Sequence, residues 1–180
     1  MAKRIRTQAM RILDAHKVPY TVHQFPDTIH NAGEVAEQIG LPPAQVFKTL
    51  VVLRADALNA HPLLVMVPAT QELDLRYFAQ EIGVKAVHMA SHDQAEKLTG
   101  LKVGGISALT LLNRPFDSYI DNSAQHFAEI AVSAGQRGVD LQLKVDDLVR
   151  LTEAHFASVT PPSITLGDEL GDKQVENPPL

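Results

Sequence analysis

Residues 46–54, VFKTLVVLR, place a single lysine in the middle of an otherwise apolar run. In an extended strand alternate side chains take opposite faces, so Lys48 shares one face with Val46 and Leu50. Both faces of the run are apolar, which predicts a central strand that is covered on both sides. The ammonium of Lys48 then either reaches solvent at the rim of the sheet or points into a pocket that needs a cation. The run alone leaves both interpretations open.

The apolar runs that follow predict the fold class. Residues 129–133 and 139–144 flank the segment 134–138, which contains two glycines, and this spacing is typical of a β-hairpin. Strands that occur in neighbouring pairs favour an α+β fold with a mixed or antiparallel sheet over a doubly wound parallel sheet. The expected helices cover 4–16, 32–39, 74–82, 92–98 and 145–157. The expected strands cover 20–25, 46–54, 63–69, 85–89, 109–113, 117–121, 129–133 and 139–144, and a further strand leads into a glycine turn within 101–107.

The chain of 180 residues is long enough for one domain, which we expect to cover residues 1–160. Residues 161–180 hold four prolines and four acids with little periodicity, and they predict a loosely ordered acidic tail. The chain contains no cysteine, which excludes a disulfide scaffold, a thiolate metal site and a cysteine nucleophile.

The charge balance argues against a long, non-specific grip on nucleic acid. Without the tail, 15 basic and 17 acidic residues remain, so the body is close to neutral although its N-terminal end is basic. No apolar run approaches the roughly 18 residues of a membrane span. The N-terminus has no apolar segment typical of a signal peptide, so we expect a cytoplasmic protein without a membrane partner.

Two further segments carry residues with chemical potential. Gly104-Gly105-Ile106-Ser107 can bring backbone amides close to a ligand, although two adjacent glycines also fit a plain tight turn. In the hairpin, Asp140 falls just inside a strand, where a carboxylate is unusual. Asp140 can pair with Lys48, bind a substrate ammonium, pair with Arg137 or lie solvated at an edge.

The eight histidines do not predict a metal site. His88 and His92 are four residues apart but straddle the end of a strand and the start of a helix, and there is no H-E-x-x-H motif. No nucleophile-elbow motif surrounds any serine, which disfavours a serine hydrolase. We therefore expect chemistry without a metal or an organic cofactor.

In this order and spacing, four motifs resemble the YbaK/EbsC family, the free-standing aminoacyl-tRNA deacylases related to the editing domain of bacterial prolyl-tRNA synthetases. The motifs are V-F-K-T-L-V-V at 46–52, P-A-x-x-x-L-D-L at 68–75, T-G-L-K-V-G-G-I-S at 99–107 and V-S-A-G-x-R-G-V-D-L at 132–141. The resemblance covers about residues 5–158. It implies a single α+β domain in which helices surround a mixed, barrel-like sheet, and it implies the hydrolytic removal of a wrong amino acid from tRNA in trans.

The resemblance also implies the roles of individual residues. Its catalytic positions fall on Lys48, Gly105 and Ser107, and its substrate-binding positions fall on Phe25, Thr49, Gly104, Ile106, Ser133 and Asp140. Relatives that clear cysteine usually continue the glycine loop as G-G-I-S-P-L-G, whereas this chain has Ala108-Leu109-Thr110, and Phe25 stands where a tyrosine is common. Both departures concern which amino acid is cleared.

The function that the resemblance implies is a trans-editing deacylase of the Cys-tRNA(Pro) or Ala-tRNA(Pro) type. Its partners would be the aminoacylated 3′ end of tRNA and prolyl-tRNA synthetase. Water or the side chain of the substrate would attack the ester. A non-catalytic module that binds a small metabolite or an aminoacyl-nucleotide is the main alternative, and a nucleic-acid-binding protein driven by the basic N-terminus is a third.

Overall fold

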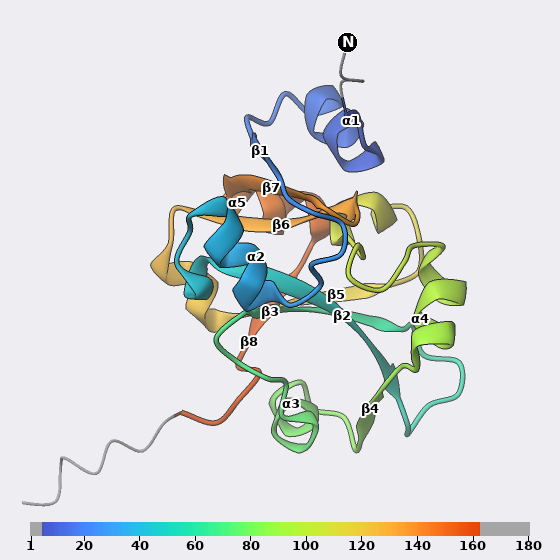
Figure 1. The fold of residues 1–180 in the computed structure, drawn as a ribbon. Helices are drawn as coiled ribbons and strands as arrows, with labels where there is room; N and C mark the ends of the chain where they lie inside the picture. Colours follow the sequence, from blue (N-terminus) through green and yellow to red (C-terminus); the bar gives the residue numbers. More distant parts are fainter. Residues whose placement is uncertain (1–4, 163–180) are drawn as a thin grey trace, which may run out of the picture.

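The computed structural model describes residues 5–162, whose centre is an eight-stranded mixed sheet (Figure 1). The strands are β1 (Thr21–Gln24), β2 (Val46–Arg54), β3 (Leu63–Pro68), β4 (Val87–Met89), β5 (Asp117–Asp121), β6 (Glu129–Gln136), β7 (Val139–Lys144) and β8 (His155–Ala157). They lie in the order β1-β7-β6-β2-β3-β5-β8, and β4 pairs with β2 beside this path. The pairs β2–β6, β3–β5 and β5–β8 are parallel and the others are antiparallel. The expected α+β fold with a mixed sheet is confirmed. In the described part of the chain, β1 and β8 form the two open edges of this sheet.

Five α-helices and three short 3₁₀ helices connect these strands in the described residues. The Asn31 side chain accepts hydrogen bonds from the backbone N–H groups of Gly33 and Glu34, and Ser91 forms a capping box with Gln94, so both expected N-caps are confirmed. The α-helices are α1 (Gln8–Ala15), α2 (Ala32–Ile39), α3 (Leu75–Glu81), α4 (His92–Thr99) and α5 (Val145–Thr152). The 3₁₀ helices are η1 (Pro43–Gln45), η2 (Ala108–Leu111) and η3 (Asn122–His126).

Helices cover both faces of β2, as the apolar pattern of this strand requires. Phe47 and Val51 belong to a core cluster that includes residues of α1, α4, α5 and η2 on one face. On the other face Val46 packs with α2 residues, and Val52 packs with Phe78 of α3. Figure 1 shows α1 and α3 at opposite ends of the molecule, with the sheet between them. Lys48 shares the second face and lies between the clusters under α2 and α3.

Four expectations about secondary structure are wrong. Residues 101–107 form turns and irregular structure rather than a strand. The run 109–113 does not form a strand either, because Ala108, Leu109 and Leu111 are buried on one side of the 3₁₀ turn η2. The last helix ends at Thr152, since Glu153 takes a left-handed φ of 52°, and the chain continues as β8. At the other end of the chain, α1 begins at Gln8 because Thr7 caps it, whereas we expected a start at residue 4.

The sheet has a gap on one side of β2. On this edge β6 pairs only with Val46 and Phe47, and β4 pairs only with residues from Val52 to Arg54. The opposite edge is fully occupied, because β3 pairs with β2 from Phe47 to Val52. Residues 48–50 therefore have no strand beside them on the first edge, and this gap is where the site lies.

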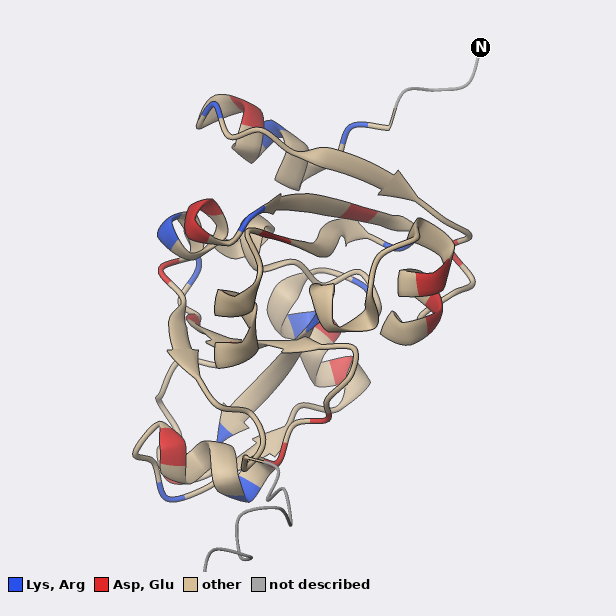
Figure 2. Cartoon of the chain, turned by 90° about the vertical axis from the view of Figure 1, so that its left-hand side faces the viewer, with Lys and Arg blue, Asp and Glu red and all other residues tan. Residues whose placement is uncertain are grey.

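Three broader expectations concern the tail, the charge and the membrane. Most of the tail expected at 161–180 lies outside the described residues, because only 161 and 162 are described. In the view of Figure 2, segments of lysine and arginine and segments of aspartate and glutamate are both scattered over the molecule, which agrees with the near-neutral body. None of the helices in residues 5–162 combines the length and apolar character needed to cross a membrane.

Candidate active site

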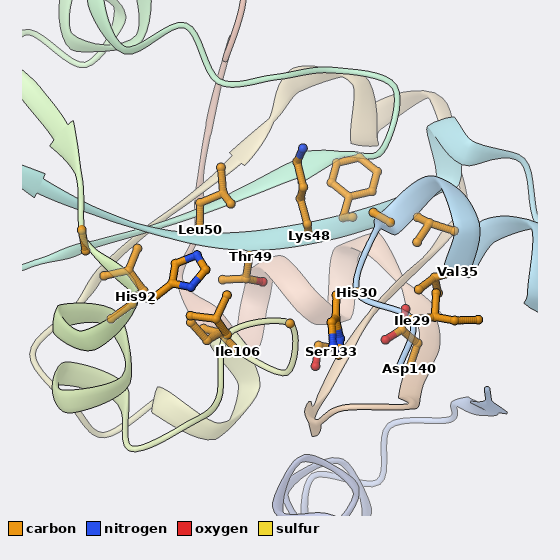
Figure 3. Close-up of a pocket in the computed structure, with 18 of the residues that line it drawn as sticks. Ile29, His30, Val35, Lys48, Thr49, Leu50, His92, Ile106, Ser133 and Asp140 are labelled. Carbon is orange, nitrogen blue, oxygen red and sulfur yellow. The ribbon is translucent and has the colours of Figure 1, made fainter. Parts of the chain in front are cut away.

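A cavity of about 210 Å³ occupies the gap beside β2 (Figure 3). Its walls come from the segment before α2, from β2, from the start of α4, from the glycine loop and from the β6–β7 hairpin. Seven of the nine expected site residues line it, namely Phe25, Lys48, Thr49, Gly104, Ile106, Ser133 and Asp140. Gly105 and Ser107 are not among the lining residues. The cavity is smaller than the 300–1,000 Å³ typical of sites for drug-sized ligands, and its size suits one small amino acid.

Lys48 lies at the wall of the cavity, and its ammonium is already bonded. Its Nζ donates a 2.7 Å hydrogen bond to Oε1 of Glu72, and the Lys48 side chain keeps 26% of its exposure. Figure 3 shows Lys48 and Leu50 rising on one side of β2, whereas Ile106, Ser133 and Asp140 lie on the other side in this view. Lys48 is thus neither splayed into bulk solvent nor directed at the glycine loop.

Thr49 presents unpaired groups to the cavity. Neighbouring residues of a strand direct their backbone groups to opposite edges, and the carbonyl of Val51 accepts from Ala90 N–H on the edge with the gap. The N–H and C=O of Thr49 therefore point into the gap. The Oγ1 of Thr49 is buried and has no hydrogen-bond partner among the described residues. Because an unpaired buried hydroxyl is costly, a ligand that bonds to it gains affinity.

Asp140 is a buried acid without a cation. It is 7% exposed, and no hydrogen bond or ion pair of its carboxylate is formed within residues 5–162, so it pairs with neither Lys48 nor Arg137. Burial raises the pKa of the Asp140 carboxyl to about 7. Ser133 lies directly opposite Asp140 in the β6–β7 ladder, and its Oγ accepts from Gly135 N–H at 3.2 Å.

The glycine loop packs tightly against the β6–β7 hairpin. A Cβ at Gly105 would lie 2.9 Å from the backbone nitrogen of Arg137, so only glycine fits there. The N–H of Gly105 donates to Lys102 C=O at 2.8 Å, which leaves the N–H groups of Gly104, Ile106 and Ser107 as the other donors of the loop. Ser107 is 1% exposed, and its Oγ has no partner among the described residues.

Two histidines also line the cavity, although the sequence offered no reason to choose them over the other six. The ring of His30 lies against Gly104, where a Cβ added to the glycine would come within 3.4 Å of Nδ1. His92 is the first residue of α4 and reaches the wall from the other side (Figure 3). The only signal for His30 was its position beside Asn31, which caps α2. In residues 5–162 no three His, Asp or Glu side chains are grouped so that they could hold a metal ion.

The family model of the aminoacyl-tRNA editing domain matches residues 27–151, which include every lining residue discussed above except Phe25. This chain belongs to the aminoacyl-tRNA editing domain family. The resemblance to the YbaK/EbsC deacylases is thereby confirmed at the level of the family.

Known relatives agree with this assignment. EbsC of Enterococcus faecalis, named as an inferred Cys-tRNA(Pro)/Cys-tRNA(Cys) deacylase, is 35% identical over 157 residues, which are 86% of this chain and 93% of that protein. An inferred trans-editing enzyme for prolyl-tRNA synthetase aligns with a TM-score of 0.72 at 22% identity, over 88% of this chain and 100% of that one. The hypothetical protein APE2540 aligns with a TM-score of 0.73 at 21% identity, over 83% of this chain and 96% of that one. At these identities the two solved structures support the fold alone.

Proposed function

We propose that this protein is a trans-editing deacylase that hydrolyses the ester between a wrongly attached amino acid and tRNA, with substrates of the Cys-tRNA(Pro) or Ala-tRNA(Pro) type. Membership of the aminoacyl-tRNA editing family supports the reaction class, and the likeness to EbsC supports the substrate class. The observation that carries the proposal is that one small cavity brings together the unpaired carboxylate of Asp140, the unpaired hydroxyl of Thr49 and the glycine loop.

Asp140 is suited to bind the α-ammonium of the aminoacyl group. A buried carboxylate without a partner is destabilised by the loss of water, and a cationic ligand that enters the cavity compensates for that loss. Ser133, directly opposite on the neighbouring strand, adds a hydroxyl on the same side of the cavity. An aminoacyl ester offers an ammonium two bonds from its carbonyl, so the same contact places the carbonyl within the gap.

The ester carbonyl would then lie between Thr49 and the glycine loop. The backbone N–H of Thr49 and the N–H groups of Gly104 and Ile106 are the donors that the cavity walls offer to the oxygen on which negative charge develops. Each well-placed donor of this kind contributes roughly 3 kcal/mol to stabilising the transition state. Gly105 serves the loop differently, because its N–H closes the turn and its missing Cβ allows the close packing on the hairpin.

Lys48 is suited to hold a phosphate of the 3′-terminal nucleotide. Its ammonium lies on the side of β2 away from the loop and is bonded to an exposed carboxylate, which a phosphate can replace. This geometry favours the phosphate over the ester carbonyl as the partner of Lys48.

In the reaction the nucleophile adds to the ester carbonyl and the bond to the ribose oxygen breaks, with a proton returned to that oxygen. Water as nucleophile releases the free amino acid. With cysteine, the thiol of the substrate can attack its own carbonyl, which the high effective concentration of an intramolecular group favours. A cavity of this size would also exclude bulkier amino acids and so act as a second sieve.

The proposal includes a partner and a compartment. A near-neutral body gives little electrostatic affinity for tRNA, so prolyl-tRNA synthetase would supply the choice of tRNA. Because the substrates and this partner belong to translation, the proposal places the protein in the cytoplasm.

The test is a deacylation panel with purified tRNA(Pro) charged with cysteine, alanine, serine or proline, and with cysteine on its own tRNA. We expect loss of the label from Cys-tRNA(Pro) or Ala-tRNA(Pro) and no loss from Pro-tRNA(Pro). Absence of turnover with every wrongly charged tRNA would contradict the proposal and favour the non-catalytic binding module.

A further inference from the structure

Side chains hold both backbone polar groups of Val103, the residue that precedes the glycine loop. The backbone N–H of Val103 donates to Oε1 of Glu96 at 3.1 Å, and the Nε of Arg137 donates to the C=O of Val103 at 2.7 Å. Val103 immediately precedes Gly104, which takes a left-handed φ of +88°. Because the N–H and the C=O of Val103 are both held, the direction in which the backbone enters the glycine loop at Gly104 is fixed.

The two side chains come from different walls of the cavity. Glu96 lies on α4, and Arg137 lies in the turn between β6 and β7, the hairpin that carries Ser133 and Asp140. Neither residue lines the cavity. The two hydrogen bonds to Val103, which we call the clamp, thus connect α4, the glycine loop and the hairpin outside the cavity.

The Glu96 side chain is itself held in place. Lys102 Nζ donates to Oε2 of Glu96 at 2.9 Å, and the Lys102 ammonium, together with the Val103 N–H, lowers the pKa of Glu96. The C-terminus of α4 is anchored by Arg114, which donates to the carbonyls of Leu98 and Thr99 at 2.6 and 2.8 Å. Glu96 is therefore presented to the loop from a helix with a fixed end.

We propose that Arg137 and Glu96 are positioning residues for the editing reaction, which set the glycine loop from outside the cavity by holding the backbone C=O and N–H of Val103. This inference rests on the proposed deacylase function. In this inference the arginine of the V-S-A-G-x-R-G-V-D motif, Arg137, holds a backbone carbonyl. It neither binds a tRNA phosphate nor pairs with Asp140. The backbone N–H donors of the glycine loop act on the transition state more than on bound substrate. Loss of the clamp should therefore lower kcat more than it raises KM.

The test compares variants that keep or remove each hydrogen bond. Arg137→Met removes the donor to Val103 C=O, whereas Arg137→Lys keeps a donor. Glu96→Ala removes the acceptor for Val103 N–H, whereas Glu96→Gln keeps an oxygen there. We expect the Met and Ala variants to lose about 10- to 100-fold in kcat while KM stays within about threefold, because displacements near 1 Å cost about this much. We expect Lys and Gln to recover most of the activity.

The second readout does not depend on activity. Amide hydrogen exchange over residues 101–108 should accelerate in Arg137→Met and Glu96→Ala and return toward the wild-type rate in Arg137→Lys and Glu96→Gln. Lys97→Met is the matched control, because it removes an exposed cation of α4 and neither bond to Val103, and it should keep wild-type kcat. If Arg137→Met does not fold, the Glu96 pair decides the question alone.

Three results would overturn the inference. They are a wild-type kcat in both Arg137→Met and Glu96→Ala, a raised KM with an unchanged kcat, and a loss of kcat without faster exchange in the loop. Failure of the proposed function looks different, since then the wild-type protein clears none of the charged tRNAs while the exchange measurements still report on the clamp.

Discussion

The ammonium of Lys48 is bonded to Glu72, on the loop that follows β3, at 2.7 Å, and not to the buried Asp140. The exposed glutamate is thus a counterion that any anionic ligand of Lys48 must displace. Two consequences can be measured, one for each member of the pair.

Replacing Glu72 by glutamine should make Lys48 easier to reach. An exposed ion pair is weak, so we expect Glu72→Gln to lower KM for aminoacyl-tRNA by about two- to fivefold while kcat stays unchanged. Steady-state deacylation at low and moderate salt measures this change. A KM that stays the same or rises would show that Lys48 does not exchange its partner for substrate.

Lys48→Ala should abolish deacylation and leave the fold intact. The side chain is partly exposed and its ion pair is at the surface, so we expect the midpoint of urea unfolding to change little. Lys85→Ala, which removes an exposed lysine between α3 and β4, is the matched control and should retain full activity. Wild-type clearance of mischarged tRNA by Lys48→Ala would refute the assignment of this residue.

Asp140 should make the stability of the protein depend on pH. Its folded pKa is raised from 3.8 to about 7, so the folded state binds the proton more tightly than the unfolded state does. This contribution to stability is complete below about pH 4 and is lost as the pH rises through about 7, by at most about 4 kcal/mol.

The variant Asp140→Asn isolates this effect. We expect urea unfolding at pH 5 and pH 8 to show a smaller loss of stability in the variant than in the wild type. Deacylation by the variant should fall about 10- to 100-fold, because the amide cannot pair with the α-ammonium. Equal pH dependence of the two proteins would contradict the burial of an ionisable, unpaired Asp140.

Gly105→Ala should disturb the glycine loop. Its Cβ would meet the backbone nitrogen of Arg137 at 2.9 Å and the carbonyl carbon of Gln136 at 3.1 Å, neither of which can move aside cheaply. We expect a loss of about 1–3 kcal/mol of stability together with a marked loss of activity. Gly83→Ala is a control at a left-handed φ of +74° with open space around it, and it should cost stability without loss of activity.

Binding of tRNA should be weak without a partner. The near-neutral body predicts a low affinity that falls further as salt is raised, and added prolyl-tRNA synthetase should increase clearance of Cys-tRNA(Pro). Binding titrations at two salt concentrations, with and without the synthetase, measure both effects. A tight complex of tRNA with the isolated protein that is insensitive to salt would contradict this prediction.

Much of the fold could be predicted because its signals are local. The apolar run around Lys48, the cap at Asn31 and the glycines of the hairpin each specify their own element, and the structure contains all three. The strand expected at 109–113 failed because a short apolar run has no period that separates a strand from a 3₁₀ turn. The final strand β8 was missed because only its parallel pairing with β5 defines it.

The site could be predicted as a set of residues but not as a geometry. The motifs placed Lys48, Thr49 and Asp140 at one cavity, yet sequence spacing carries no information on the direction of a long side chain. The partner of Lys48, Glu72, and the contact of His30 with Gly104 both arise from segments that meet only in three dimensions. The gap beside β2 is equally non-local, since it depends on where β6 leaves that strand and β4 joins it.

The pairing of β2 with β6 joins Val46 and Phe47 to residues about 85 positions further along the chain. A chain that is still being made on the ribosome lacks that partner strand, and β7 with Asp140 emerges later still. Hydrolytic competence is therefore acquired only after β7 has been made, so a shorter nascent chain should be unable to strip charged tRNAs in the vicinity of the ribosome that makes it.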